Sequence, residues 1–343
     1  MKFKRMPWLL VLCCVLLAVT LVAWSCDGTN GEQEEEEEEE GVVYTIGLTQ
    51  LVTHPAMEAA RNGFIDALAD AGYIEGVNVE YDFRNPEGDP TAEQTIAQGF
   101  VDDEVDLIYS FGTSISQQCI NAAEGTGIPV LFCAVTDPVA AELVASWDHP
   151  GENVTGTSDY IEVASSVDLI LEIVPGVETI GTIYNAGEVN SQVLVADLNE
   201  ACDALGIEVV EVTVSTSADV LTAAQSLVGQ VDVIWVGTDN TVVSGLEAVL
   251  GVCEENLIPF FPSDDPSIEK GGIACLGFDY YDVGYQTGEM AARILDGESA
   301  EDIPVELGET FSYSVNTAAA ELYGVTIPED ILEKATIYEE LAP

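Results

Sequence analysis

Short polar side chains recur in this sequence at the points where apolar stretches end. The stretches VDLIYSF (105–111) and VDVIWV (231–236) both stop at a glycine, and hydroxyl, carboxylate or amide side chains then follow. Six such ends carry these groups: Thr49 and Gln50; Thr113 and Ser114; Thr136 and Asp137; Asn185; Thr238, Asp239 and Asn240; Ser263, Asp264 and Asp265. Together they offer hydrogen bonds and negative charge, which is the chemistry of a site for a small polar solute. Each one alone is explained more simply as a helix N-cap.

The elements that position these groups alternate along the chain from residue 42. β-branched and aromatic runs are followed by stretches in which apolar residues recur every three or four positions, as they do in helices. In the first half, strands are expected at 42–49, 77–83, 105–112 and 128–135, and helices at 55–73, 91–103 and 114–125. This alternation predicts a parallel sheet that helices cover on both faces.

The same pattern starts again after about residue 157. Strands are expected at 178–185, 207–214, 231–238 and 258–265, and corresponding segments of the two halves lie 126 to 134 residues apart. The predicted fold class is therefore α/β, with two doubly wound parallel-sheet lobes in series. In such sheets ligands bind beyond the carboxyl ends of the strands. Two facing lobes would thus bring the polar groups together in one cleft.

Seven segments carry a resemblance to a known family. They are IGLTQLVTHPAMEAARNGFIDAL, DLIYSFGTS, IPVLFCAVTDPV, GENVTGTSD, TIGTIYNAGEVNSQ, VIWVGTDNTVVS and SDDPSIEKGGIACLGFDYYDVGYQTGEMAARILDGE. In this order they resemble the solute-binding proteins of ABC importers, of the type-I periplasmic-binding-protein fold, and more narrowly the tryptophan/tyrosine-type lipoprotein family. The resemblance covers roughly 42–335.

This resemblance implies two lobes joined by a three-strand hinge. The N-terminal lobe would comprise 42–157 plus 283–305, and the C-terminal lobe would comprise 158–282 plus 306–343. The segments GENVTGTSD and GFDYYD would lie at two of the three crossings.

The resemblance also implies a small-molecule ligand, in this branch of the family often an aromatic amino acid. Asp239 is predicted to bind its ammonium, helped by Glu188 or Asp137. Hydroxyl groups at helix N-termini are predicted for its carboxylate, because the helix dipole favours anions there: Thr113, Ser114 and Thr136. An alanine at position 239 is expected to weaken amino-acid binding by more than about tenfold without disturbing the fold.

The complete predicted site is larger than these groups. The residues predicted to contact the ligand are Gln50, His54, Thr113, Ser114, Thr136, Asp137, Asn185, Glu188, Asn190, Ser191, Thr238, Asp239, Asn240 and Asp264. An aromatic wall is predicted from Phe111, Tyr160, Tyr184 and Phe278. No arginine is expected in the pocket. Hydroxyl groups and backbone N–H groups are therefore predicted to bind the ligand's carboxylate, in place of a bidentate arginine.

The N-terminal segment predicts export and anchoring. A basic start, an apolar run at 8–24 and Cys26 indicate a lipoprotein signal peptide over 1–25, although an uncleaved anchor helix is the alternative. The residues before Cys26 resemble a lipobox, from which Trp24 departs. Residues 26–41 are then the lipidated cysteine and an acidic tether, because the seven glutamates at 34–40 repel one another. This places the protein outside the cytoplasm, anchored to the cell membrane by lipid, and on the periplasmic face in a Gram-negative host.

Charge and the rare residues exclude several classes of function. The chain has 62 acidic and 8 basic residues and a formal net charge of −54, which argues against nucleic-acid partners. Such acidity resembles proteins of saline habitats. Only His54 and His149 are present, no nucleophile elbow or P-loop occurs, and the five cysteines after Cys26 form no C-x-x-C. We expect no enzyme, no cofactor and no metal site.

The function expected is therefore solute capture for an ABC importer. The partners would be a small-molecule ligand, the ABC permease and the membrane through the lipid anchor, with the protein itself a monomer. A ligand sensor that presents the bound solute to a membrane receptor is the alternative with the same fold. A transcription regulator with a similar core is disfavoured by the export signal.

Overall fold

The structure of the protein is a computed structural model that describes residues 43–151 and 153–341. The predicted signal peptide, Cys26 and the glutamate run lie outside these residues. Within the described ranges, no helix combines the length and the apolar character that crossing a bilayer requires.

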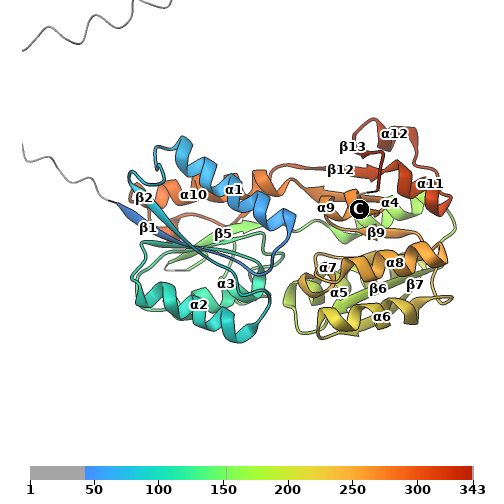
Figure 1. The fold of residues 1–343 in the computed structure, drawn as a ribbon, viewed down its shortest axis with the longest axis horizontal. Helices are drawn as coiled ribbons and strands as arrows, with labels where there is room; N and C mark the ends of the chain where they lie inside the picture. The colour runs from blue at the N-terminus through green and yellow to red at the C-terminus, as the bar shows by residue number, and fades with distance from the viewer. Residues whose placement is uncertain (1–42, 152, 342–343) are drawn as a thin grey trace, which may run out of the picture. The chain divides into compact units, whose positions relative to one another are not determined.

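One group of elements, here called the N-lobe, surrounds a six-stranded sheet (Figure 1). Its strands follow the order β11-β5-β4-β3-β1-β2, and every pairing is parallel. They are β1 (Tyr44–Gln50), β2 (Val79–Arg84), β3 (Leu107–Phe111), β4 (Val130–Cys133), β5 (Val154–Ser158) and β11 (Glu306–Leu307). The helices are α1 (Pro55–Asp70), α2 (Pro90–Asp102), α3 (Thr113–Ala123), α10 (Tyr280–Leu295) and the 3₁₀ turn η2 (Ala300–Asp302). Helices α1 and α10 cover one face of the sheet, and α2 and α3 cover the other.

The second group, the C-lobe, repeats this design. Its parallel sheet has the order β9-β8-β6-β7, which corresponds strand for strand to β4-β3-β1-β2. The strands are β6 (Thr179–Asn185), β7 (Glu208–Val214), β8 (Val233–Val236) and β9 (Phe260–Pro262). The helices are α4 (Val163–Ile173), α5 (Val189–Leu205), η1 (Ser217–Asp219), α6 (Val220–Leu227), α7 (Asn240–Val243), α8 (Leu246–Asn256) and α9 (Asp265–Lys270). The duplication predicted from the sequence is therefore confirmed in the topology.

A separate three-stranded sheet completes the C-lobe and was not foreseen. It consists of β10 (Ala274–Phe278), β12 (Phe311–Asn316) and β13 (Ala335–Tyr338), with α11 (Thr317–Tyr323) and α12 (Glu329–Leu332) alongside. The β10–β12 pairing is antiparallel, and the β12–β13 pairing is parallel.

Three segments cross between the lobes: 159–162 after β5, Asp279 before α10, and 308–310 between β11 and β12. They are tied to one another, because the N–H of Gly308 donates to the carbonyl of Ser158 (2.9 Å) and that of Asp279 to the carbonyl of Thr310 (3.2 Å). The fold is thus two parallel-sheet lobes, as predicted, and the three segments that join them are extended connections rather than strands. The boundaries proposed from the sequence remain a proposal, and the lobe names below refer to the residues grouped around each sheet.

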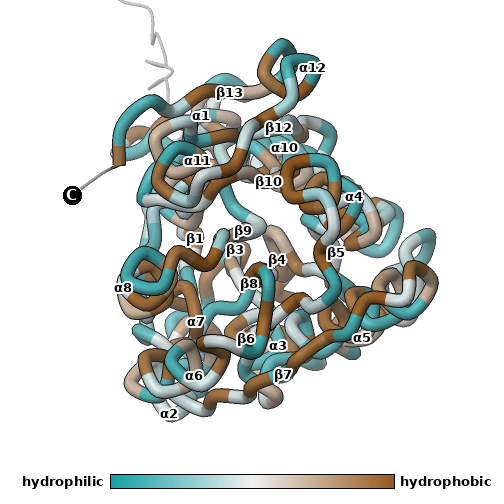
Figure 2. Tube along the Cα trace, turned by 90° about the vertical axis from the view of Figure 1, so that its right-hand side faces the viewer, coloured by the Kyte–Doolittle hydropathy of each residue, from teal (hydrophilic) through white to brown (hydrophobic). Residues whose placement is uncertain are grey.

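Each lobe has its own hydrophobic core. Phe64, Phe100 and Tyr109 are fully buried in the N-lobe, as are Trp235 and Phe260 in the C-lobe. Figure 2 shows hydrophobic and hydrophilic residues alternating along the helices, as expected where one helix face covers a sheet and the other meets water. Two cores of this kind let the lobes move as units about the crossings.

Glycines allow α1 and α10 to pack in close, parallel contact. A Cβ atom at Gly284 would lie 1.8 Å from the carbonyl oxygen of Ala60, and one at Gly288 would lie 2.6 Å from that of Phe64. Ala60 therefore faces Gly284, and Phe64 faces Gly288, so both helices run in the same direction. This places their N-termini at the same end of the N-lobe, beside the C-lobe.

Candidate functional site

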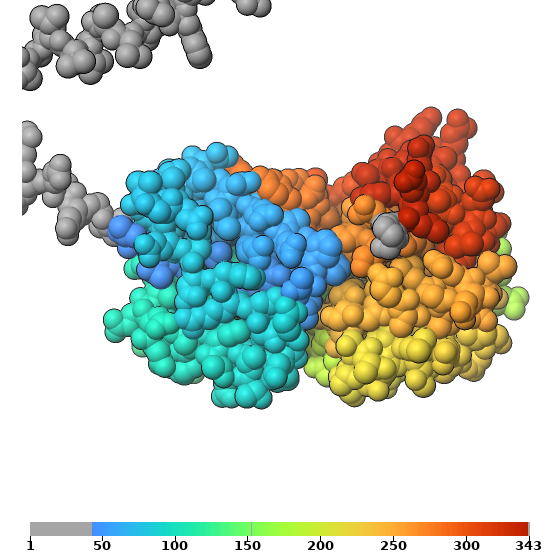
Figure 3. All heavy atoms as spheres, in the orientation of Figure 1, coloured from blue at the N-terminus to red at the C-terminus, as the bar shows by residue number. Residues whose placement is uncertain are grey.

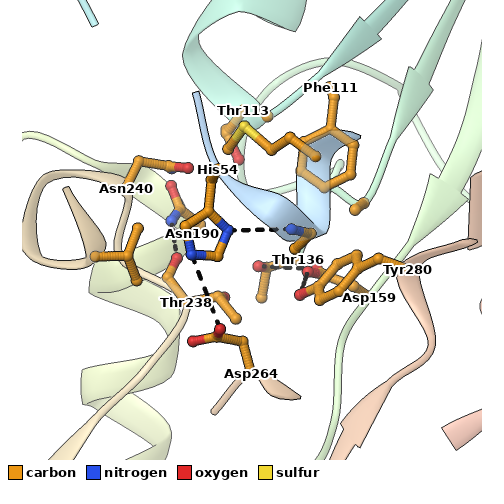
Figure 4. A pocket seen from close by; sticks show the side chains of 15 residues that line it. His54, Phe111, Thr113, Thr136, Asp159, Asn190, Thr238, Asn240, Asp264 and Tyr280 are labelled. Carbon is orange, nitrogen blue, oxygen red and sulfur yellow. Dashed lines mark hydrogen bonds and ion pairs between the residues drawn. The ribbon is translucent and has the colours of Figure 1, made fainter. Parts of the chain in front are cut away.

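A cavity lies between the lobes at the carboxyl ends of their strands (Figure 4). The lining residues are His54, Ala56, Met57, Phe111, Gly112, Thr113, Ala134, Thr136, Asp159, Asn190, Thr238, Asn240, Val243, Asp264 and Tyr280. Figure 3 shows atoms of the two lobes meeting along one face, so the cleft is closed there.

The N-lobe supplies the open N-terminus of α3. Gly112 precedes this helix with φ = 104°, a left-handed conformation that glycine adopts without strain. No side chain caps the helix, so its first N–H groups remain available to an outside acceptor beside Thr113. The end of β3 therefore presents a binding site for an anion to the cavity.

His54 and Asp264 approach each other across the cleft. His54 caps α1, and its Nδ1 accepts a hydrogen bond from the N–H of Ala56 (3.3 Å). The proton of the neutral ring is therefore on Nε2, which lies 4.0 Å from Oδ1 of Asp264. Burial lowers the pKa of His54, and the Asp264 carboxylate partly offsets this effect. A neutral imidazole thus presents an N–H donor to the cavity.

Asp159 lies at the floor of the cavity, in the first crossing segment, and sequence reasoning missed it. Its carboxylate accepts hydrogen bonds from the hydroxyls of Tyr280 (2.9 Å) and Thr136 (3.3 Å). No lysine, arginine or histidine of the described residues forms an ion pair with it. Burial raises its pKa to about 6. The site therefore holds a half-buried acid without a cation among the described residues.

The C-lobe contributes amide groups from the starts of α5 and α7. The Nδ2 group of Asn190 donates to the carbonyl of Thr238 (2.8 Å), and that of Asn240 donates to Glu188 (2.7 Å). The Oδ1 atom of Asn190 is buried and has no hydrogen-bond partner among the described residues. An unpaired buried acceptor in a cavity wall points to a donor on the ligand.

Asp239, which was predicted to bind the ligand's ammonium, lies outside the wall of this cavity. Asp239 is 1% exposed and is not part of the cavity wall. Its carboxylate accepts from the N–H groups of Asn185 (2.6 Å) and Val242 (2.7 Å) and from the hydroxyl of Ser191 (2.7 Å). Burial and the nearby Glu188 raise its pKa to about 6. Asp239 therefore caps α7 inside the C-lobe.

Other predicted contacts also have internal partners. Glu188 accepts from the N–H groups of Asn240 and Thr241, each at 3.0 Å. Gln50 bonds to Arg61, and Asp137 caps its own turn. The predicted residues outside the cavity wall are Gln50, Ser114, Asp137, Asn185, Glu188, Ser191 and Asp239; those in it are His54, Thr113, Thr136, Asn190, Thr238, Asn240 and Asp264.

The predicted aromatic wall is partly corrected as well. Phe111 lines the cavity, and Phe278 lines a neighbouring one. Tyr160 and Tyr184 do neither, because their hydroxyls donate to Asp197 and Glu211 at 2.8 Å within the C-lobe. The apolar residues that sequence reasoning missed include Met57, Val243 and Tyr280. Asp159 and Tyr280 belong to GENVTGTSD and GFDYYD, so their place at lobe crossings was the available signal.

The Asp239→Ala substitution is now expected to act on stability. It leaves two N–H groups and a hydroxyl without their acceptor, which should lower the free energy of unfolding by about 3 kcal/mol. Asp89→Ala is a matched control, because Asp89 is an exposed cap of α2 and its loss should cost about 1 kcal/mol. Urea denaturation measures both. A variant at 239 with unchanged stability and weakened ligand binding would restore the original assignment.

Comparisons with known proteins agree with this geometry. The sequence matches the family of ABC transporter substrate binding proteins over residues 45–338. It is 43% identical over 279 residues to a tyrosine-binding protein of Clostridioides difficile, covering 81% of this chain and 80% of that protein.

Two solved structures are similar to the whole described part. A crystal structure of an ABC domain from Streptococcus pneumonia in complex with L-Trp has a TM-score of 0.83 at 33% identity. A ligand-free, open structure of a substrate binding protein with adhesive properties from Clostridium difficile has a TM-score of 0.67 at 41% identity. Both alignments cover 87% of this chain and 100% of the other.

The structure is thus more similar to the ligand-bound relative, although its sequence is more similar to the open one. This difference fits a cleft that is closed here. The match extends over nearly all of the described residues, and the names of these relatives describe tyrosine binding, a complex with L-Trp and substrate binding. The chain belongs to the family of ABC transporter substrate-binding proteins.

Proposed function

We propose that this protein captures an α-amino acid with an aromatic side chain and delivers it to the permease of an ABC importer. The observation that carries the proposal is the half-buried carboxylate of Asp159 in the cavity wall, which forms no ion pair with a lysine, arginine or histidine of the described chain. A buried charge is costly unless an opposite charge accompanies it. The ammonium of an amino acid would supply that charge.

The carboxylate of the ligand has a separate place. The uncapped N-terminus of α3 favours an anion, and Thr113 and the Nε2–H group of His54 add donors. No arginine or lysine of the described residues lines the cavity. Helix N–H groups would therefore bind the carboxylate, and the unpaired Oδ1 atom of Asn190 would accept a further hydrogen from the ammonium.

Apolar side chains surround these polar groups. Met57, Phe111, Val243 and Tyr280 line the cavity, and the rings of Phe111 and Tyr280 lie 5.8 Å apart. Aromatic and thioether walls favour a flat ring. The tyrosine-binding relative and the L-Trp complex support an aromatic side chain on the ligand.

Delivery depends on closure of the lobes. Asp159 and Thr113 belong to the N-lobe side and Asn190 and Asp264 to the C-lobe, so a bound amino acid would contact both. Its affinity would then be higher for the closed state, which shifts the population toward closure. A receptor that binds the same closed state is the alternative partner.

The proposal also includes export by the signal peptide at 1–25 and lipidation of Cys26. Labelling of the protein with a fatty acid in cells tests the lipidation.

Calorimetric titration tests the function. Tyrosine, tryptophan and phenylalanine are compared with analogues that lack either the amino group or the carboxyl group. We expect micromolar or tighter binding of at least one amino acid and a loss of about 100-fold or more for each truncated analogue. Binding of sugars or nucleosides in place of every amino acid would contradict the proposal.

The affinity should also depend on pH. An ammonium binds ionised Asp159, whose pKa of about 6 lies above the ordinary value of 3.8. The dissociation constant should be constant above pH 7 and should rise by up to about tenfold per pH unit below pH 6. At pH 6 the Asp159 carboxyl is about half protonated, so complex formation should release up to about half a proton, because the ammonium favours the ionised acid. Titrations in two buffers of different ionisation enthalpy measure this release. Proton uptake would contradict the assignment of Asp159.

A further inference from the structure

A second, small cavity adjoins the first on its C-lobe side. Asp159, Thr238 and Tyr280 form part of the wall of both cavities. About 20 Å³ of the second cavity is open to a sphere the size of a water molecule. A cavity needs about 10–15 Å³ of such space to hold one water molecule. The second cavity therefore has room for a single water molecule beside the carboxylate that we assign to the ligand's ammonium.

Two polar atoms of residues in this wall have no hydrogen-bond partner in the described part of the chain. They are Nε1 of Trp235 and Oγ of Ser263, and both atoms are buried. Trp235 as a whole is 2% exposed. A buried polar group without a partner costs free energy, and ordered water commonly supplies the partner in proteins. Two such groups around a space of this size point to one shared water molecule.

The cavity lies between the end of the C-lobe sheet and the lobe crossings. Trp235 belongs to β8, and Ser263 directly follows the neighbouring strand β9. A Cβ atom at Gly237 would lie 3.1 Å from Cη2 of Trp235, so the indole ring extends toward the carboxyl end of β8. Asp159, which directly follows β5, and Tyr280, the first residue of α10, form the opposite side. A molecule in the cavity would thus contact both sides of the closed cleft.

The hydrogen-bonding properties of the wall identify this molecule as water. The indole N–H of Trp235 can only donate, and the ionised carboxylate of Asp159 can only accept. A molecule between them must accept from the indole and donate to the carboxylate. A metal cation cannot accept the indole hydrogen, and the carboxylate repels an anion. Water meets both requirements in the space available.

We propose that one ordered water molecule in this cavity links Asp159 to Trp235 and Ser263 and thereby orients the carboxylate toward the ammonium of the ligand. The water accepts from the indole N–H, and it donates one hydrogen to Asp159 and the other to Oγ of Ser263. It adds to the hydroxyls of Thr136 and Tyr280, which donate to Oδ1 and Oδ2 of Asp159. Trp235 and Ser263 are then positioning residues. The inference rests on the proposed function, in which Asp159 binds the ammonium.

Calorimetric titration of two variants tests these positioning roles. The ligands are whichever of tyrosine, tryptophan and phenylalanine binds the native protein most tightly, and the arylpropionic acid that equals this amino acid without its amino group. Trp235→Phe and Ser263→Ala each remove one partner of the water and should each lower the affinity for the amino acid by about fivefold or more. The affinity for the arylpropionic acid should stay within about twofold, because it has no ammonium for Asp159 to bind.

Thr182→Val is the matched control. Thr182 is the register partner of Trp235 in the neighbouring strand β6, it is buried, and its hydroxyl also lacks a partner among the described residues. It lies outside the wall of the second cavity, and valine has nearly the same shape. This variant should therefore change neither affinity. A loss as large as that of Ser263→Ala would show that packing of the sheet, rather than the cavity, controls binding, and would overturn the inference.

A crystal structure of the amino-acid complex detects the water directly. We expect one water molecule within about 3.2 Å of Nε1 of Trp235, of Oγ of Ser263 and of the Asp159 carboxylate. The same site should be empty or disordered in crystals of Ser263→Ala. A dry cavity in the native complex would overturn the inference.

The outcomes separate this inference from the proposed function. If Ser263→Ala keeps the native affinity, the inference is overturned while binding of the amino acid still supports the proposed function. Equal losses for the amino acid and for the arylpropionic acid would show that the two residues support the shape of the cleft, and would overturn the inference as well. Failure of every amino acid to bind the native protein contradicts the proposed function itself. Ser263→Ala keeps the test decisive if Trp235→Phe does not fold.

Discussion

Replacing Asp159 by asparagine should greatly weaken amino-acid binding and at the same time stabilise the ligand-free protein at pH 7.5. Asparagine keeps the shape of the side chain, accepts the Thr136 hydroxyl through its oxygen and can donate to the Tyr280 oxygen. It lacks the charge that would bind an ammonium. Losing one partner of a desolvated charge pair costs about 2–5 kcal/mol, so the affinity should fall by about 30-fold or more.

The gain in stability follows from the raised pKa of Asp159. The pKa of Asp159 is about 6 in the folded protein, whereas its ordinary value, taken for the unfolded chain, is 3.8. Ionisation of this carboxyl group is therefore less favourable in the folded protein than in the unfolded chain. The native protein therefore loses stability as the pH rises from about 4 to 6, and above pH 7 the whole cost is present, on the order of 3 kcal/mol. The neutral amide removes this cost, so the variant should melt at a higher temperature at pH 7.5 and at a similar temperature at pH 4.

Calorimetry of Asp159→Asn measures both effects, and Asp137→Asn serves as the control. Asp137 caps a turn next to Thr136 but lies outside the cavity wall, so neither affinity nor melting temperature should change much. If Asp159→Asn keeps the native affinity, another group binds the ammonium. If it melts lower at both pH values, Asp159 serves the fold rather than the ligand.

Much of the fold could be predicted from the sequence because the hydrophobic pattern is duplicated. Strands with similar sequences at similar spacing occupy equivalent places in both lobes, as VDLIYSF in β3 and VDVIWV in β8 show. The three-stranded sheet had no such counterpart. Two lobe crossings separate β10 from β12, and two short helices separate β12 from β13, so local pattern alone did not connect them.

The site was only half predictable because caps and ligand contacts use the same residue types. Asp239 and Asp264 each follow a C-lobe strand and each cap the next helix. Only Asp264 also reaches the cavity, because Asp239 is held inward by the N–H of Asn185 and the hydroxyl of Ser191. These partners come from distant parts of the chain. Asp159 directly follows β5 and so also lies at a strand end, but no strand was predicted at 154–158, so this position was not recognised.

Gly284→Ala should be among the most destabilising substitutions in the N-lobe. The new Cβ atom would lie 1.8 Å from the carbonyl oxygen of Ala60 and 2.4 Å from its carbon, and both belong to the backbone of α1. No change of rotamer relieves such a clash, so α1 and α10 must move apart and lose contact along the pair. We expect the free energy of unfolding to fall by about 3 kcal/mol or more.

Two further glycines make this prediction specific. A Cβ atom at Gly288 would be 2.6 Å from the Phe64 carbonyl oxygen, so its alanine variant should lose less. Gly251 lies in α8 with no atom within 4 Å of such a Cβ, and alanine there should stabilise the helix by about 0.5–1 kcal/mol. Urea denaturation should therefore rank the alanine variants at 251, 288 and 284 from most to least stable.

The helix pair also supports the binding cavity. Because α1 starts beside His54 and α10 starts at Tyr280, separating the helices should displace these two residues of the cavity wall. Equal stability of the variants at 284 and 251 would show that the helix pair tolerates the added methyl group, and would remove this link between helix packing and the site.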